Sequence, residues 1–122
     1  MGRVVHFEIS ADDPERAIKF YQDIFGWKIQ KYGEIEMDYW LINTGLKESN
    51  GIDGAIMKRY LPAGASTINT IEITNIEETI DKVIKAGGKK DTDVEIIPGV
   101  GKFCYCLDTE GNYFGILQPI EM

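Results

Sequence analysis

Histidine, cysteine and proline are scarce in this chain, and acidic residues outnumber basic ones. The 122 residues include one histidine, two cysteines and four prolines. Thirteen Lys and Arg residues stand against 20 Asp and Glu residues, which gives a formal net charge of −7 at pH 7. Because affinity for nucleic acids and anionic lipids depends largely on clustered positive charge, this balance argues against both partners.

The two cysteines, Cys104 and Cys106, are separated by one residue in an apparent strand. This spacing puts both on one strand face, with their Cα atoms near the outer limit for a disulfide. We therefore expect free thiols, as in a reducing compartment. The sequence has no apolar run long enough to span a membrane and no basic and apolar leader, so we predict a cytoplasmic protein without a membrane partner.

The segment from Val4 to Trp27 predicts a strand, a helix and the start of a second strand. Apolar and polar residues alternate over positions 5–11, which is the period of a strand with one apolar face. His6 therefore points away from the apolar side. The Asp-Asp-Pro sequence at 12–14 can cap and begin a helix, and Gly26 suits the residue after its end.

A second segment, Thr67 to Gly88, repeats this plan. Its first residues alternate as a strand in which Ile68, Thr70 and Glu72 share one face. Asn75 and Glu78 stand three apart, as a capping box requires. The helix that follows has an apolar stripe of Ile76, Ile80, Val83 and Ile84.

Three strands are expected after each helix. They are 27–32, 37–44 and 52–60 in the first half, with a turn at Gly33-Glu34, and 89–97, 102–107 and 112–118 in the second. A chain of this length can bury about two thirds of its unfolded surface, enough for one self-sufficient core. We predict an α+β fold and a single domain, with module one at 1–60, a linker at 61–66 and module two at 67–122.

This duplicated βαβββ plan carries HFEISADDPERAIKFYQDIFGWKI in front and PGVGKFCYCLDTEGNYFGILQP at the end. It resembles the vicinal oxygen chelate superfamily, the glyoxalase, bleomycin-resistance and extradiol-dioxygenase group, over nearly the whole chain. The resemblance implies that each module curls into half of an open barrel. It also implies that the two halves enclose a concave cleft, with the helices outside.

The resemblance further implies where a metal would bind. Metal enzymes of the superfamily commonly use a His on the first strand, a His or Glu at the start of the second module and a Glu on the last strand, with a fourth ligand on the first module's last strand in some members. His6 matches the first position. The other positions fall on Ile68 or Thr70, on Gly115, and on Gly54.

A divalent ion needs three or more protein donors, so His6 alone cannot hold it, and we expect no cofactor. The alternative is a divalent metal, Zn, Ni, Mn or Fe, held by His6 with Glu8 and Glu72. Asp53 adds a donor if it points inward instead of Gly54. Such a metal would make the chain a lyase, an isomerase or a dioxygenase.

The expected concave face carries the candidate ligand-binding residues, which are His6, Glu8, Thr70, Glu72, Tyr113 and Gly115. Two interpretations stay open for several of them: His6 is either a pocket residue or a core histidine, and the two glutamates contact either a ligand or solvent and basic side chains. The aromatic residues Tyr39, Trp40, Tyr105 and Tyr113 either form a wall for a ligand or pack in the core, and Tyr113 is best placed for the wall.

We expect the chain to bind a small organic molecule without a catalytic metal. The net negative charge favours cationic molecules on encounter, such as bleomycin-like drugs, and the aromatic residues favour aromatic ones. Open sheet edges and a concave surface leave area that a second copy can cover, so we predict a homodimer.

Overall fold

The computed structural model describes residues 2–33, 38–60 and 66–120. Its helices and strands confirm the predicted α+β class. In chain order they are β1 (Arg3–Ala11), α1 (Pro14–Phe25), β2 (Lys28–Lys31), β3 (Tyr39–Asn43), β4 (Gly54–Lys58), β5 (Thr67–Glu72), α2 (Ile76–Lys85), β6 (Lys89–Lys90), β7 (Glu95–Ile97), β8 (Gly101–Leu107) and β9 (Tyr113–Pro119).

The chain divides into two compact units, His6–Thr67 and Met1–Val5 with Ile68–Met122. Both units contain the predicted order of a strand, a helix and further strands. Residues 61–65 of the predicted linker, and residues 34 and 37 of the expected hairpin, lie outside the described part of the chain. The interpretation of the chain as one domain stays a prediction.

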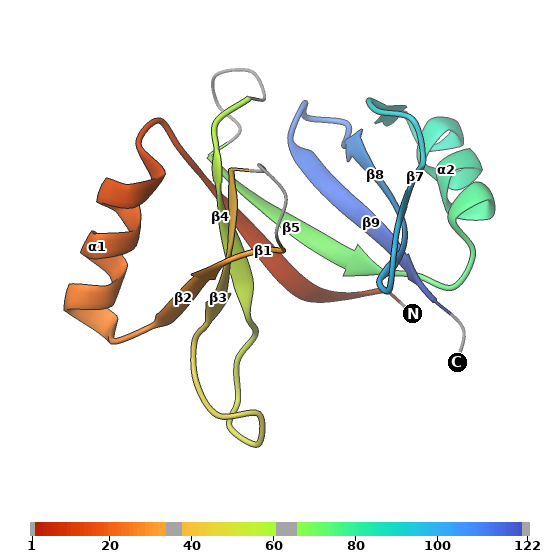
Figure 1. Cartoon of the computed structure of the whole chain (residues 1–122). Helices are drawn as coiled ribbons and strands as arrows, with labels where there is room; N and C mark the ends of the chain where they lie inside the picture. Colours follow the sequence, from red (N-terminus) through yellow and green to blue (C-terminus); the bar gives the residue numbers. More distant parts are fainter. Residues whose placement is uncertain (1, 34–37, 61–65, 121–122) are drawn as a thin grey trace. The chain divides into compact units, whose positions relative to one another are not determined.

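The unit His6–Thr67 is a sheet with α1 on one face. The strand order is β2-β3-β4-β1, with β1 parallel to β4 and the other pairs antiparallel. Helix α1 packs against β2 and β4, as Figure 1 shows. The core of the unit is built from alternate strand residues that face the helix, because the side chains of a strand change face at every residue. Its buried members are Ala11, Ile42 and Ile56.

The helix caps follow the sequence prediction. The Asp13 side chain accepts a hydrogen bond from the Arg16 backbone N–H at 3.2 Å. Gly26 ends α1 in the left-handed region with φ 70°, where glycine has no steric cost. At α2, the Asn75 side chain accepts from the Glu78 N–H at 3.0 Å. Capped ends fix where each helix begins and therefore which stripe it turns to its sheet.

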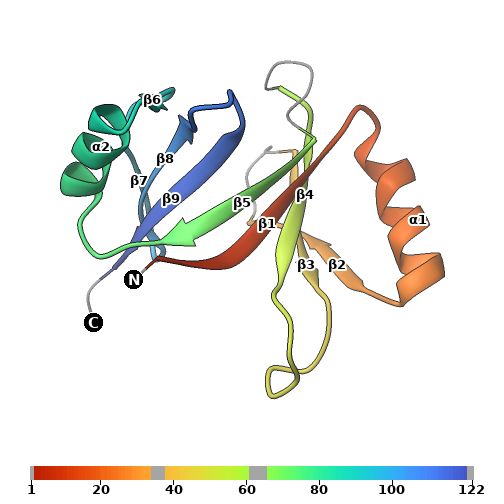
Figure 2. The ribbon, with the colours of Figure 1, turned by 180° about the vertical axis from the view of Figure 1, so that it is seen from behind.

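The second unit has the strand order β5-β9-β8-β6, with β7 also paired to β8. Helix α2 packs on β8 and β9 (Figure 2). Cys104 and Cys106 are fully buried in this core, and their Sγ atoms lie 3.8 Å apart as free thiols. The expectation of free thiols is confirmed. In the described residues, neither helix is long and apolar enough to cross a membrane.

The predicted continuous strand 89–97 is wrong. The structure has two short strands there, β6 and β7, which both pair with β8. Between them the backbone N–H groups of Asp91 and Thr92 both point to the Tyr105 carbonyl, at 2.9 and 3.2 Å. One carbonyl that accepts two successive N–H groups breaks the regular ladder of hydrogen bonds, as in a β-bulge.

Candidate functional site

The face of the His6–Thr67 sheet that points away from α1 carries polar side chains. On β1, Phe7 and Ile9 pack toward α1, so His6 and Glu8 point to the other side. Glu8 is opposite Ala55 in the strand register, and Ala55 is opposite Leu41. Tyr39, two residues before Leu41, shares this side. The sequence prediction that His6 points away from the apolar face is confirmed.

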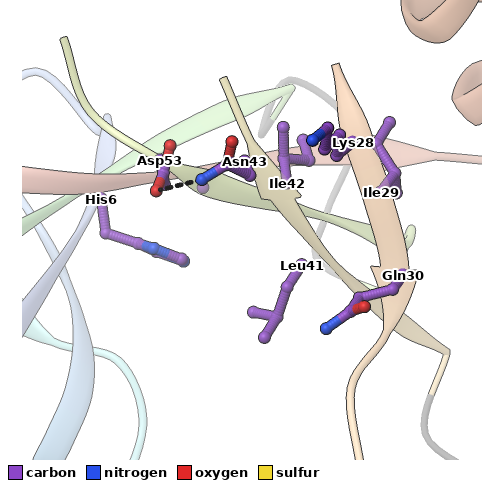
Figure 3. Close-up of a pocket in the computed structure, with 9 residues that line it drawn as sticks. His6, Lys28, Ile29, Gln30, Leu41, Ile42, Asn43 and Asp53 are labelled. Atoms are coloured by element: carbon purple, nitrogen blue, oxygen red, sulfur yellow. Dashed lines mark hydrogen bonds between the residues drawn. The ribbon is translucent and has the colours of Figure 1, made fainter. Parts of the chain in front are cut away.

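A pocket of about 450 Å³ lies on this face. In Figure 3 the side chains of His6, Leu41 and Gln30 point into the same space from β1, β3 and β2. The complete lining is His6, Lys28, Ile29, Gln30, Leu41, Ile42, Asn43, Asp53 and Gly54. The pocket thus combines aliphatic surface with one basic, one acidic and several neutral polar groups, a mixture suited to a small organic molecule.

A chain of hydrogen bonds leads from the pocket into the sheet. The Tyr39 hydroxyl donates to Glu8 Oε2 at 2.7 Å and lies 3.0 Å from His6 Nε2. A tyrosine hydroxyl has one proton, so toward His6 it can only accept. The imidazole therefore carries its proton on Nε2. Glu8 is only 5% exposed, and such a buried carboxyl group needs hydrogen bonds of this kind.

Burial is the main cause of the shifted pKa values of His6 and Tyr39 in this hydrogen-bonded group. It lowers the pKa of His6 from its usual 6.5, against smaller opposing effects of the Glu8 and Asp53 charges. Burial also raises the pKa of Tyr39 far above its usual 10, and the neighbouring Glu8 carboxylate raises it further. At neutral pH the imidazole is therefore uncharged and the tyrosine keeps its proton.

The Asp53 side chain faces the pocket, whereas Gly54 lines it with backbone and a side chain at Gly54 would point to the helix side. The register pairs Gly54 with Phe7, and a side chain at Gly54 would meet the Phe7 ring 2.7 Å away. The assignment of Gly54 to the inner wall is therefore wrong, and Asp53 takes that side. Its carboxylate is already held, by the Thr44 backbone N–H at 2.8 Å and by the Asn43 amide at 3.4 Å.

The other four candidate residues belong to the second unit. Thr70 and Gly115 are opposite each other in the register of β5 and β9. Thr70 is 2% exposed, and its hydroxyl makes no hydrogen bond within the described part of the chain. Glu72 is exposed. Burial and the nearby Asp91 carboxylate raise the pKa of Tyr113 above its usual 10. A role of these residues in ligand binding stays a prediction.

The space beside Gly115 is filled by an aromatic ring. A side chain at this position would meet the Phe103 ring 2.6 Å away and the Thr70 hydroxyl 3.3 Å away. Glycine is required here because the Phe103 ring, from the neighbouring strand β8, occupies the space that a side chain would need. The choice of Gly115 as a candidate ligand-binding residue did not take this ring into account.

Known proteins resemble the chain in sequence and in fold. Residues 3–45 match the family model described as bleomycin resistance protein-like N-terminal. A glyoxylase-like domain-containing protein of Didymella fabae is 35% identical over 119 residues, which cover 94% of this chain and 92% of that protein. The chain belongs to the vicinal oxygen chelate superfamily.

Solved structures agree with membership of the vicinal oxygen chelate superfamily. A glyoxalase/bleomycin resistance protein/dioxygenase superfamily member from Vibrio splendidus has a TM-score of 0.67 at 17% identity, over 95% of this chain and 97% of that one. Methylmalonyl-CoA epimerase from Mycobacterium tuberculosis has a TM-score of 0.69 at 12% identity, over 97% of this chain and 88% of that one. These likenesses show a shared fold.

Among the residues at the superfamily's metal positions, His6 is the one with a usual metal-binding side chain. Within each unit, the described residues contain no group of three His, Cys, Asp or Glu side chains that could hold one. His6 Nε2 and Glu8 Oε2 both bind the Tyr39 hydroxyl instead. The alternative set of His6, Glu8 and Glu72 draws on both units and stays a prediction.

Sequence reasoning missed how Tyr39 works in this site. The sequence places Tyr39 among the candidate aromatic residues. Its hydroxyl contacts Glu8 and His6, which lie 31 and 33 positions away in the chain, and no local pattern shows such contacts. Gln30, Leu41 and Asn43 were missed altogether. Alternation along the strands at 28–31 and 39–43 indicates that these residues share a face, but only the register shows that this face is the one of His6.

Proposed function

We propose that the chain binds a small organic molecule in the pocket of the His6–Thr67 unit without the help of a metal ion. The observation that carries this proposal is the pocket itself, at about 450 Å³, with His6 at one side and aliphatic and amide groups around it. Drug-sized ligands occupy pockets of roughly 300–1,000 Å³. Superfamily membership supports the proposal.

The proposed ligand is aromatic and either neutral or cationic. The pocket offers the Leu41 side chain for an apolar ring and the Asp53 carboxylate for a positive group. Lys28 is the one lysine or arginine of the lining, and the His6 ring is uncharged at neutral pH. The net charge of −7 attracts cations over longer distances.

Three ring compounds of similar shape and different charge test this proposal: benzamidine, benzamide and benzoate. We expect affinity to fall in that order, measured by calorimetry or by thermal stabilisation. A ligand present at about 100 times its dissociation constant adds about 2.7 kcal/mol to the free energy of unfolding.

Two Leu→Trp variants provide the control. Leu41→Trp fills the pocket and should abolish binding, whereas Leu46→Trp introduces the same ring at a site that is 78% exposed and outside the pocket. Equal binding by both variants, or no binding of any of the three compounds, would contradict the proposal. Stabilisation by Zn, Ni, Mn or Fe that disappears in His6→Ala would favour the metal-dependent enzyme instead. The homodimer stays a prediction.

A further inference from the structure

Helix α1 carries large apolar side chains that its own sheet does not cover. Phe20, Ile24 and Phe25 are 55%, 55% and 59% exposed, whereas α2 has one such side chain, Ile84 at 54%. In Figures 1 and 2, α1 lies on one face of the sheet of its unit, and its opposite side points away from that sheet. Apolar side chains scattered singly over a surface are normal, but adjacent ones often mark an interaction site.

Phe20 and Ile24 lie on one side of the helix, and we call them the α1 patch. They are four residues apart, so their side chains are neighbours on the helix surface. The Phe20 ring lies edge-on to Tyr21 at a centroid distance of 5.2 Å, and Tyr21 packs against the buried core of the unit. A ring already held in place loses little conformational entropy when another surface docks on it. Phe25 belongs to another side, about 140° from Phe20 at about 100° per residue.

The residues around Phe20 are arranged so that two copies of the helix fit each other. Arg16 and Asp23 lie about 40° and 60° to one side of Phe20, at about 100° per residue. Ile24 and Ala17 lie at the same angles on the other side. Within each pair, one residue precedes Phe20 and the other follows it, by about 4.5–6 Å along the axis. An antiparallel copy on a two-fold axis beside Phe20 therefore brings Arg16 opposite the partner's Asp23, and Ile24 opposite the partner's Ala17.

The charged side chains beside the α1 patch are held only by exposed ion pairs. Arg16 lies 3.9 Å from Asp13, and the Lys19 ammonium donates to Asp23 at 2.6 Å. Exposed ion pairs contribute little to stability and are screened by salt. Arg16 and Asp23 can therefore turn to a second copy at little cost.

The α1 patch supplies most of the apolar area that a small dimer interface needs. Phe20 exposes roughly 100 Å² of apolar surface, about half of its side chain, and Ile24 a similar area. Two copies thus contribute roughly 400 Å². The smallest specific interfaces bury about 1,000 Å², of which about 600 Å² is apolar. The partly exposed Ala17 and the aliphatic part of Arg16 add to it, so we expect a dissociation constant on the order of 100 µM.

We propose that two copies of this chain associate through the α1 patch, with the two α1 helices antiparallel and Phe20 beside the two-fold axis. Phe20, Ile24 and Ala17 form the apolar centre of this interface, and Arg16 and Asp23 form its charged rim. This surface differs from the sheet edges and the concave face on which a second copy was expected. The pocket lies on the face of the sheet that points away from α1, so the inference does not depend on the proposed function.

Two isoleucines test which surface is used. Ile24 and Ile84 are each the second-last residue of their helix, and they are 55% and 54% exposed. Ile24→Glu places an unpaired carboxylate in the interface and should weaken association about tenfold or more, whereas Ile84→Glu should leave it unchanged. Sedimentation from about 10 µM to about 1 mM measures both variants. Association that is unchanged in Ile24→Glu, or equally weakened in both, would overturn the proposal.

An exchange of charges tests the antiparallel arrangement. Arg16→Asp and Asp23→Arg each place like charges opposite each other and should weaken association about threefold or more, with a smaller loss at high salt. The double variant restores opposite charges and should associate within about twofold of wild type. An acid in the first turn and a base in the last turn suit the helix dipole, so α1 should stay folded. A double variant as weak as the single ones would overturn this arrangement.

Wild type provides a test without any substitution. Backbone NMR signals that shift with protein concentration should lie in α1 between residues 16 and 24. Shifts confined to the sheet edges, or a chain that stays monomeric up to about 1 mM, would overturn the proposal. In the second case the α1 patch is left to a different protein. Binding of benzamidine by Ile24→Glu as by wild type shows that the pocket functions whether or not the chain associates.

Discussion

Replacement of Tyr39 by phenylalanine should lower the free energy of unfolding at neutral pH and have a smaller effect at alkaline pH. The phenyl ring keeps the packing of Tyr39 but lacks the hydroxyl that joins Glu8 at 2.7 Å and His6 at 3.0 Å. Hydrogen bonds to charged groups contribute about 1.5–3 kcal/mol. We expect Tyr39→Phe to lose about this amount at pH 7.

The alkaline effect follows from the pKa of Tyr39, which burial raises far above its usual 10. A group whose pKa is raised in the folded state contributes stability that is complete below the unfolded pKa and is lost as the pH rises. Above about pH 10 the unfolded chain releases this proton while the folded chain keeps it, so wild type loses about 1.4 kcal/mol per pH unit. At about pH 11.5 the loss is roughly 2 kcal/mol, and phenylalanine has no such loss.

Urea unfolding of both proteins at pH 7 and at steps between about pH 9 and 11.5 measures the difference directly. The free energies of unfolding of wild type and Tyr39→Phe should differ by about 1.5–3 kcal/mol at pH 7, and this difference should shrink by roughly 2 kcal/mol over the alkaline range. Glu8→Gln is the control: burial is the larger cause of the raised pKa, so this variant should keep most of the alkaline loss. A gap that stays constant up to the highest pH would refute the assignment of Tyr39 as a buried, protonated donor.

Two further predictions concern the same sheet. Gly54→Ala should destabilise the protein by about 1–3 kcal/mol or more, because the new Cβ would lie 2.5 Å from the Phe7 carbonyl oxygen. Gly45→Ala, whose Cβ meets only the Ser49 hydroxyl at 3.4 Å, should be nearly neutral, and equal melting temperatures for the two variants would be the contrary result. His6→Gln should reduce the loss of stability on acidification. The lowered pKa of His6 means that the unfolded chain binds a proton below pH 6.5 before the folded chain does. This costs wild type up to about 1.4 kcal/mol at pH 5.5, which urea unfolding at pH 7 and 5.5 would detect.

Local patterns predicted most of the secondary structure. The alternation around His6 fixes which side chains of β1 face the helix, and the caps at Asp13 and Asn75 fix where the helices begin. The pattern failed between residues 89 and 97, where no local signal shows that two N–H groups share the Tyr105 carbonyl. Such a bulge depends on the partner strand, which a single segment does not reveal.

The fourth strand shows why the site was harder to predict than the fold. Whether Asp53 or Gly54 faces inward depends on a shift of one residue, because neighbours on a strand point to opposite faces. The pairing of Gly54 with Phe7 shows that Asp53 faces inward. The same register places the Leu41 and Tyr39 side chains on the face of the sheet that carries Glu8.

The sequence by itself determined the order of elements, the capped helices and the side of β1 on which His6 and Glu8 lie, because these depend on residues close together in the chain. Tertiary structure alone decided that the Tyr39 hydroxyl lies between His6 and Glu8 and that Phe103 covers Gly115. These contacts join different strands, and the register that creates them is set by the packing of the whole sheet on its helix.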